Sequence, residues 1–162
     1  MGLAIPYGDY DMTQNDGWVS VGVDHEVAEF GVATMQQWWQ QMGQAMYPKA
    51  PHVLITADGG GSNGSRSRLW KVALQRLSDT TGLDVCACHV PPRTSKGNKI
   101  DHRLFCHLTE HWRGRPLVSH EIMVNLKGHT TSDTGLRGQT ALDPTSYPTG
   151  KKVSDDELAH VN

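Results

Sequence analysis

The sequence lacks the features that mark membrane and secreted proteins. It contains no run of about 20 apolar residues, the length that a membrane-spanning helix requires. Its first residues, MGLAIPYGDYDMT, include neither a basic start nor a long apolar stretch, so they do not read as a secretory signal. Cysteine is scarce and odd in number, at three, and Cys86 and Cys88 alternate along one predicted strand, which argues against a disulfide framework. We therefore expect a cytoplasmic protein with reduced thiols and no membrane partner.

Signals for two other classes are also missing. The sequence has no internal repeat, no low-complexity tract and no helix-turn-helix segment that would recognise a DNA site. The glycine-rich segment after Asp58 (GGGSNG) lacks the Gly-Lys-Ser/Thr ending of a phosphate-binding loop and has only part of the dinucleotide-binding spacing. Nucleotide binding is therefore disfavoured. The glycines more readily explain how backbone or nucleic acid comes close to Asp58, with the free amides of the next helix available to an anion.

Charge is unevenly distributed, although the formal net charge is only −2. Residues 1–58 carry seven acidic side chains and one basic side chain, whereas residues 66–103 carry eight basic and three acidic ones. Basic charge thus gathers around Asp58 and Asp101, as expected if a phosphate backbone approaches these carboxylates. An ordinary solvated helix face explains the same charges equally well.

Apolar residues recur with the periods of alternating strands and helices. Ser65 is the expected cap of the second helix and Gly82 its end. The predicted strands cover residues 18–23, 53–58 and 83–90, and the predicted helices cover residues 26–42, 65–80, 98–112 and 119–127, followed by a turn-rich stretch after Gly128 and a terminal helix capped by Ser154. This order predicts an α/β fold with a parallel or mixed sheet, and the chain is long enough for one domain.

Two segments each place one carboxylate beside a loop and a buried element. In HVLITADGGGSNG, Asp58 ends a predicted strand, where the functional residues of such sheets lie. In CHVPPRTSKGNKIDHRLF, Asp101 follows a proline-bounded loop. Polynucleotidyl-transferase metal sites are built from carboxylates placed in this way, because Mg²⁺ prefers hard oxygen ligands.

Several motifs together resemble one known family. They are IPYGDYD, TADGGGSNGSR followed by LWK, CHVPPRTSKGNKIDHRLF, WRGRPLVSHE and YPTGKKVSDDEL, in this order. The sequence resembles the bacterial insertion-sequence transposases of the Rhodopirellula type, whose core is a DDE domain with the ribonuclease-H-like fold, and the resemblance covers essentially the whole chain. It implies an α/β, ribonuclease-H-like domain that cuts and joins DNA strands with two Mg²⁺ ions held by three carboxylates.

The resemblance places the second carboxylate on Asp58 and the third on Asp101, as catalytic residues and metal ligands. The family's first aspartate is expected upstream of IPYGDYD, on a central strand that this chain does not include. The third carboxylate is usually Glu, one methylene longer than Asp101, and Trp is expected where Gly97 stands. We therefore expect a partial catalytic domain over residues 1–162, with a core of about 17–127 and an extension over 128–162, that is inactive alone and marginally folded.

The missing central strand also affects the expected sheet. The strand over residues 18–23 is expected either to pair with residues 53–57 or to remain an exposed edge.

Basic residues around the carboxylates are the expected DNA contacts. Lys96, Lys99 and Arg103 flank Asp101, and Asn98 either contacts DNA or caps the helix, with the cap favoured. The full set of predicted DNA-binding residues is Arg66, Arg68, Lys96, Asn98, Lys99 and Arg103. The implied partners are transposon ends and target DNA, with an upstream transposase fragment or a second copy of the chain as further candidates. The implied location is the bacterial cytoplasm, with association to the nucleoid if the chain is active.

Two alternatives remain open. A zinc-binding or interaction module would use Cys86, Cys88, His89, His102 and Cys106, although Cys-x-Cys-His on a strand is not a common spacing for a closed zinc site. Asp24 is a candidate for the missing carboxylate, but an acidic residue at the start of a helix is more often an N-cap or a first-turn acid.

Overall fold

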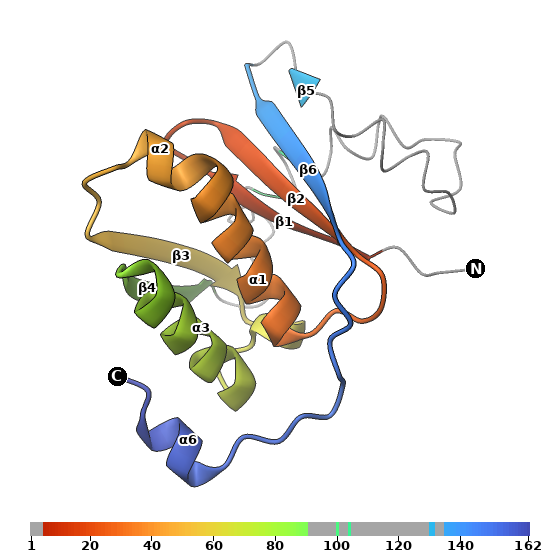
Figure 1. The fold of residues 1–162 in the computed structure, drawn as a ribbon, viewed down its shortest axis with the longest axis vertical. Coiled ribbons are helices and arrows are strands. Elements are labelled where there is room, and N and C mark those ends of the chain that lie inside the picture. Colours follow the sequence, from red (N-terminus) through yellow and green to blue (C-terminus); the bar gives the residue numbers. More distant parts are fainter. Residues whose placement is uncertain (1–4, 91–99, 101–103, 105–129, 132–134) are drawn as a thin grey trace. The chain divides into compact units, whose positions relative to one another are not determined.

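The computed structural model describes residues 5–90, 100, 104, 130–131 and 135–162. The chain, drawn in Figure 1, forms two compact units, each assembled from two separate stretches of the sequence. Unit one comprises Met1–Glu26 and Lys96–Tyr147, and unit two comprises Val27–Ser95 and Pro148–Asn162. Within the described ranges, no helix is long and apolar enough to cross a membrane.

The described residues of unit one form a four-stranded sheet. Its strands lie in the order β1 (Ile5–Asp11), β2 (Asp16–Gly22), β6 (Arg137–Asp143) and β5 (Thr130–Thr131). The first two strands form an antiparallel hairpin, in which Asn15 has a φ of 57°, a left-handed conformation that asparagine tolerates better than most residues. β6 runs parallel to β2 over the full length of both strands, and β5 pairs antiparallel with β6.

The strand predicted over residues 18–23 is present as β2, but its neighbours were predicted wrongly. It neither pairs with residues 53–57 nor remains an edge, because β1 covers one side and β6 the other. All seven residues of β2 are buried, and Val19 and Val21 pack with Leu104 and Leu136. Gly17 packs against Leu104: a Cβ at this position would come within 2.3 Å of the Leu104 Cδ1 atom, so a larger residue here would force Leu104 to shift.

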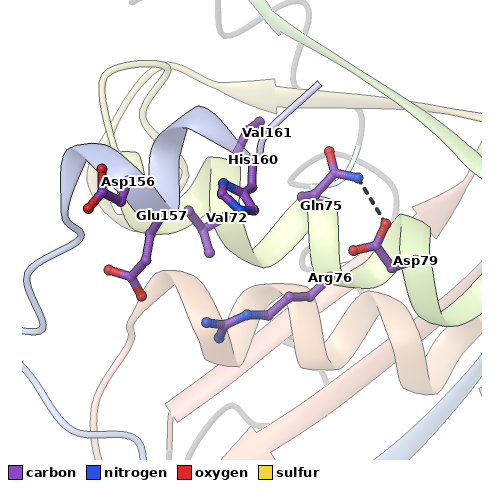
Figure 2. A pocket seen from close by; sticks show the side chains of 8 residues that line it. All are labelled: Val72, Gln75, Arg76, Asp79, Asp156, Glu157, His160 and Val161. Carbon is purple, nitrogen blue, oxygen red and sulfur yellow. Dashed lines mark hydrogen bonds between the residues drawn. The ribbon is translucent and has the colours of Figure 1, made fainter.

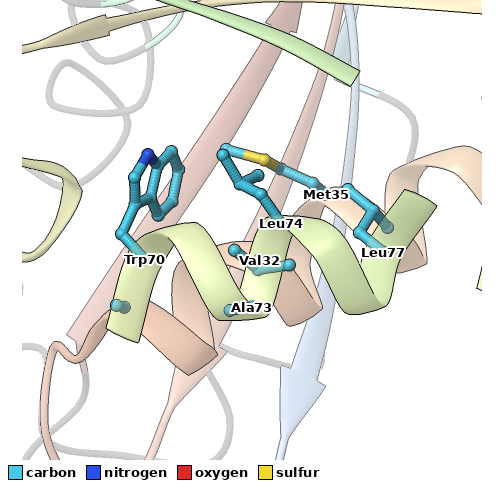
Figure 3. Packing of buried hydrophobic residues seen from close by; sticks show 7 residues of the cluster. Val32, Met35, Trp70, Ala73, Leu74 and Leu77 are labelled. Atoms are coloured by element: carbon cyan, nitrogen blue, oxygen red, sulfur yellow. The ribbon is translucent and has the colours of Figure 1, made fainter. Parts of the chain in front are cut away.

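Unit two combines a parallel pair of strands with helices. The strands are β3 (His52–Asp58) and β4 (Asp84–Val90). Helix α1 (Ala28–Trp38) continues through the π-helical segment η1 (Trp39–Gly43) into α2 (Gln44–Met46). The other helices are α3 (Arg68–Thr81) and the short C-terminal α6 (Asp155–Ala159). The core lies between α1 and α3 (Figure 3). It contains Ala28, Val32, Met35, Trp70, Ala73, Leu74 and Leu77.

The strand pair presents two different faces. Ile55, Val85 and Ala87 are partly buried against the helical core. Side chains alternate along a strand, so Leu54, which is 61% exposed, and Cys86 lie on the opposite face.

The helix ends partly match the sequence expectations. α3 ends at Gly82 as predicted, with a φ of 73°, but its cap is Ser67 and not Ser65. The Ser67 amide donates to the Gly64 carbonyl over 2.8 Å, and this turn delays the start of the helix by two residues. The predicted cap Ser154 at the start of α6 is confirmed, and it forms a capping box with Glu157.

The start of α1 differs from the expectation for Asp24. The N-cap of α1 is Val27, so the interpretation of Asp24 as an N-cap is wrong, and Glu29 is the acidic residue of the first turn. The helices predicted over residues 98–112 and 119–127 lie outside the described residues, apart from Ile100 and Leu104.

Candidate functional site

Asp58 is the last residue of β3 and lies beside the end of β4. The strands are parallel and in register, with Asp58 opposite Val90, so both strands end at the same edge. The alternation of side chains along β3 leaves Asp58 exposed. The carboxylate is therefore open to a ligand at the edge where parallel sheets carry their functional groups.

The chain leaves Asp58 through a tight glycine-rich loop. It passes Gly59 and Gly60 and enters the short 3₁₀ turn η2 (Gly61–Asn63), where Gly61 has a φ of 60°. The Gly64 amide donates to the Gly61 carbonyl over 3.4 Å. Among the described residues, nothing lies within 4 Å of a Cβ built at Gly60 or Gly61, so the loop presents bare backbone that another molecule can approach closely.

His89 attaches this loop to the sheet. Its Nε2 atom lies 2.7 Å from the Asn63 carbonyl oxygen, so Nε2 carries the hydrogen that is donated. The sequence did not predict this role. The available signal was the alternation of β4, which places His89 on the opposite face from Cys86 and Cys88.

The predicted zinc ligands are accordingly not brought together where the structure describes them. Cys86 and Cys88 are exposed, reduced and on one face of β4, while His89 is engaged on the other. His102 and Cys106 lie outside the described residues. Over the described ranges, no three His, Cys, Asp or Glu side chains form a group that could hold a metal ion.

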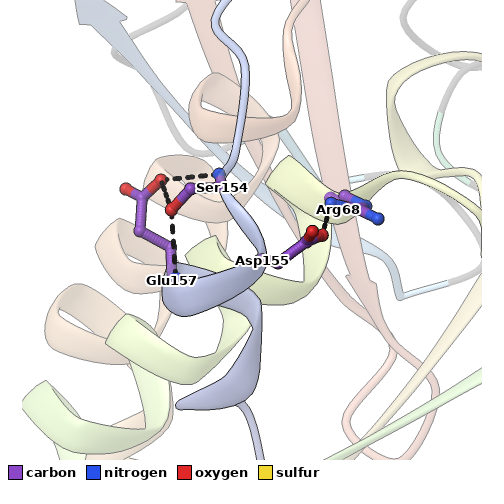
Figure 4. A network of polar contacts seen from close by, with 4 residues as sticks. All are labelled: Arg68, Ser154, Asp155 and Glu157. Atoms are coloured by element: carbon purple, nitrogen blue, oxygen red, sulfur yellow. Dashed lines mark hydrogen bonds and ion pairs between the residues drawn. The ribbon is translucent and has the colours of Figure 1, made fainter.

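Two of the predicted DNA contacts lie close to the glycine loop. Arg66 is exposed and precedes α3, and Arg68 is the first residue of that helix. Ser67 between them accepts a hydrogen bond from the Trp70 amide over 3.2 Å. Arg68 donates to Asp155 of α6 across 2.5 Å (Figure 4). The other predicted contacts, Lys96, Asn98, Lys99 and Arg103, lie outside the described residues, as does Asp101.

Asp24, the candidate for the missing carboxylate, belongs to unit one. Its Oδ1 atom pairs with the His25 ring, and its Oδ2 atom accepts from the Ser146 hydroxyl over 2.9 Å. Both oxygens are thus engaged by neighbours within its own unit, an arrangement that fits a structural role.

Asp9 is an unusual carboxyl that was not among the predicted site residues. It lies on β1 opposite Trp18, and its Oδ2 atom is buried with no hydrogen-bond partner among the described residues. Burial raises the pKa of Asp9 from 3.8 to about 8. The group is therefore a neutral acid over most of the physiological range.

A cavity of about 360 Å³ lies between α3 and the C-terminal residues (Figure 2). Its lining includes Val72, Gln75, Arg76 and Asp79 from α3, and Glu157 and His160 from the C-terminal segment. Neither Asp58 nor the glycine loop contributes to it, so the cavity is separate from the carboxylate at the end of β3.

A mixed α/β arrangement that exposes a carboxylate at the end of a parallel strand is consistent with a DDE-type transposase domain. The family model described as Rhodopirellula transposase DDE domain matches residues 1–162, the whole length of the sequence. The chain belongs to this family, and the resemblance inferred from its motifs is confirmed. Neither the comparison with curated proteins nor the comparison with solved structures gave a significant match.

Proposed function

We propose that this domain cuts and joins DNA strands by two-metal phosphoryl transfer, with Asp58 and Asp101 as ligands of Mg²⁺. The observation that carries the proposal is the position of Asp58, exposed at the carboxyl end of β3 in a chain of the DDE transposase family. The same reasoning favours a ribonuclease-H-like fold. In support, an antiparallel hairpin precedes α1, and a parallel β3–α3–β4 unit follows it.

The chemistry of the donors suits the implied metal. Asp58 offers hard carboxylate oxygens, which Mg²⁺ prefers, and its exposure leaves room for other ligands. Asp101 would add a second carboxylate. When bound, the two ions would activate water or a 3′-hydroxyl group and stabilise the leaving oxygen.

The chain's own residues would position the nucleic acid. The bare backbone at Gly60 and Gly61 gives a phosphate close access to Asp58. Arg66 and Arg68, at the start of α3, supply positive charge beside the same loop, and contacts of this kind fix the position of a DNA backbone without reading its sequence.

We infer that this chain alone does not transfer strands. The proposed ligands number two, Asp58 and Asp101, whereas the family's chemistry implies three carboxylates. Asp24, the other candidate, has both oxygens engaged by His25 and Ser146. We therefore do not assign the third carboxylate to Asp24.

The test compares Asp58→Asn with Asp84→Asn in binding and cleavage. Asp84 is an exposed aspartate at the opposite end of the same strand pair, where it contacts His52, so both changes remove one negative charge from one small sheet. We expect Asp58→Asn to weaken Mn²⁺ binding at least tenfold in calorimetry and Asp84→Asn to leave it within twofold. Equal effects would contradict a metal-ligand role for Asp58.

Cleavage of labelled transposon-end DNA with Mg²⁺ provides the second readout. It should be absent for the chain alone and appear when a segment supplying the third carboxylate is fused or added. Strand transfer by the unsupplemented chain would contradict the inferred inactivity.

A further inference from the structure

Arg68 is already occupied by an acidic group of the same chain. Its Nη1 atom lies 2.5 Å from Oδ1 of Asp155, which is 87 residues away in the sequence (Figure 4). Asp155 is the first residue of α6, as Arg68 is the first residue of α3. A carboxylate on a guanidinium satisfies the same donors that would otherwise bind a phosphate.

The C-terminal segment makes several polar surface contacts with the helices of unit two. The Lys151 ammonium donates to Glu29 of α1 over 2.7 Å, and the Asn162 amide donates to the Gln75 side chain over 3.0 Å. α6 buries none of its residues. The Arg68–Asp155 pair is itself open to water, with side chains that are 51% and 88% exposed. Contacts of this kind are individually weak and are screened by salt, so a competing anion can displace them.

The docked turn has the charge of a short stretch of phosphates. Asp155, Asp156 and Glu157 follow one another, and hydrogen bonds from Ser154, with the positive charges of Arg76 and Lys151, lower the pKa of Glu157. The turn therefore carries consecutive negative charges at neutral pH. It lies over basic residues of α3, one of which is a predicted DNA contact.

We propose that the acidic first turn of α6 competes with the nucleic-acid backbone for Arg68, so that the C-terminal segment is released when DNA binds. This inference rests on the DNA-binding role proposed above for Arg68. The segment acts as an internal substitute for the phosphate backbone and lowers the affinity of unit two for DNA until the duplex displaces it.

The test measures binding of a fluorescent duplex by anisotropy for the wild type, Asp155→Asn and Asp156→Asn. Both substitutions remove one charge from the same turn, but only Asp155 pairs with Arg68 among the described residues. We expect Asp155→Asn to bind DNA about two- to fivefold more tightly than Asp156→Asn at low salt, the range set by a surface ion pair. Arg68→Gln should weaken DNA binding. When it is combined with Asp155→Asn or with Asp156→Asn, the two double variants should bind DNA equally.

The possible outcomes separate the two proposals. If Arg68→Gln weakens binding but Asp155→Asn and Asp156→Asn bind equally, the competition is wrong and the role of Arg68 in DNA binding stands. If Arg68→Gln leaves binding unchanged, or the wild type does not bind, both are wrong.

Hydrogen exchange on the wild-type chain tests release without any substitution. The Asn162 amide donates to the Gln75 side chain of α3, so its protection reports docking of the C-terminal segment. DNA should lower the protection of this amide if the segment is released, and unchanged protection with bound DNA would overturn the competition.

Discussion

Asp9 makes the stability of the chain depend on pH. Its buried carboxyl group has its pKa raised from 3.8 to about 8, so the folded state holds this proton where the unfolded state has lost it. The stability that the neutral acid contributes is fully present below pH 4 and is lost as pH rises through about 8. The free-energy cost of ionising the buried Asp9 therefore opposes folding increasingly as pH rises across the neutral range.

We predict that Asp9→Asn flattens this dependence, because the amide has nearly the same shape and does not ionise. Urea denaturation at a series of pH values between 5 and 8.5 measures the effect. Asp156→Asn, which alters an exposed residue in the other unit, should retain the wild-type slope. If the urea midpoint of the wild type rises over this pH interval and Asp9→Asn removes the rise, the raised pKa of Asp9 is wrong.

Arg137 pairs with the buried carboxylate of Asp16 in unit one. Its Nε and Nη2 atoms donate to the two oxygens of Asp16 over 3.0 and 3.1 Å, and Asp16 is 1% exposed. This bidentate pair joins the ends of β2 and β6.

We predict that Arg137→Met destabilises the fold by roughly 1–3 kcal/mol, because it leaves a buried acceptor without its donors. Arg137→Lys keeps the charge but not the paired geometry and should cost less. Chemical denaturation of the three proteins orders them, and a methionine variant as stable as the wild type would show that water satisfies Asp16 instead.

At the scale of elements, the start of α3 distinguishes two serines. Ser67 accepts from the Trp70 amide, whereas Ser65, the cap expected from the sequence, is exposed and precedes the turn. We predict that Ser67→Ala costs about 1 kcal/mol of stability and that Ser65→Ala costs only a few tenths. The shift in denaturation midpoint measures both, and the reverse order would restore Ser65 as the cap.

Elements with strong local signals could be predicted, and those that depend on distant partners could not. β3, α3 and β4 follow from apolar periodicity and from Gly82. β1 and β6 were missed, because IPYGDYD contains proline and glycine and RGQTALD is largely polar. These strands form through pairing with the buried β2, a tertiary effect that overrides weak local preference.

The same distinction applies to the candidate site. The place of Asp58 at a strand end could be predicted from VLITAD and the glycines that follow. The anchoring of the loop by His89 and the pairing of Arg68 with Asp155 could not, since each depends on which distant segment the fold brings to it.

For the whole molecule, the most consequential feature is the return of the chain to unit one. The segment that pairs with β2 on its second side begins at Arg137, after unit two has taken up most of the intervening chain. Its contacts with Asp16 close a loop of 121 residues. Closure of such a loop has an entropic cost that must be met before its contacts stabilise the fold, so unit one should form late.

This order has a consequence during synthesis on the ribosome. The β1–β2 hairpin emerges early, and at about 5–20 residues per second its second partner follows on the order of ten seconds later. Throughout that interval the side of β2 that β6 will cover presents unpaired backbone groups beside Val19 and Val21. The nascent chain therefore passes through a period in which another hairpin of the same kind, on a neighbouring ribosome, can occupy the place of β6.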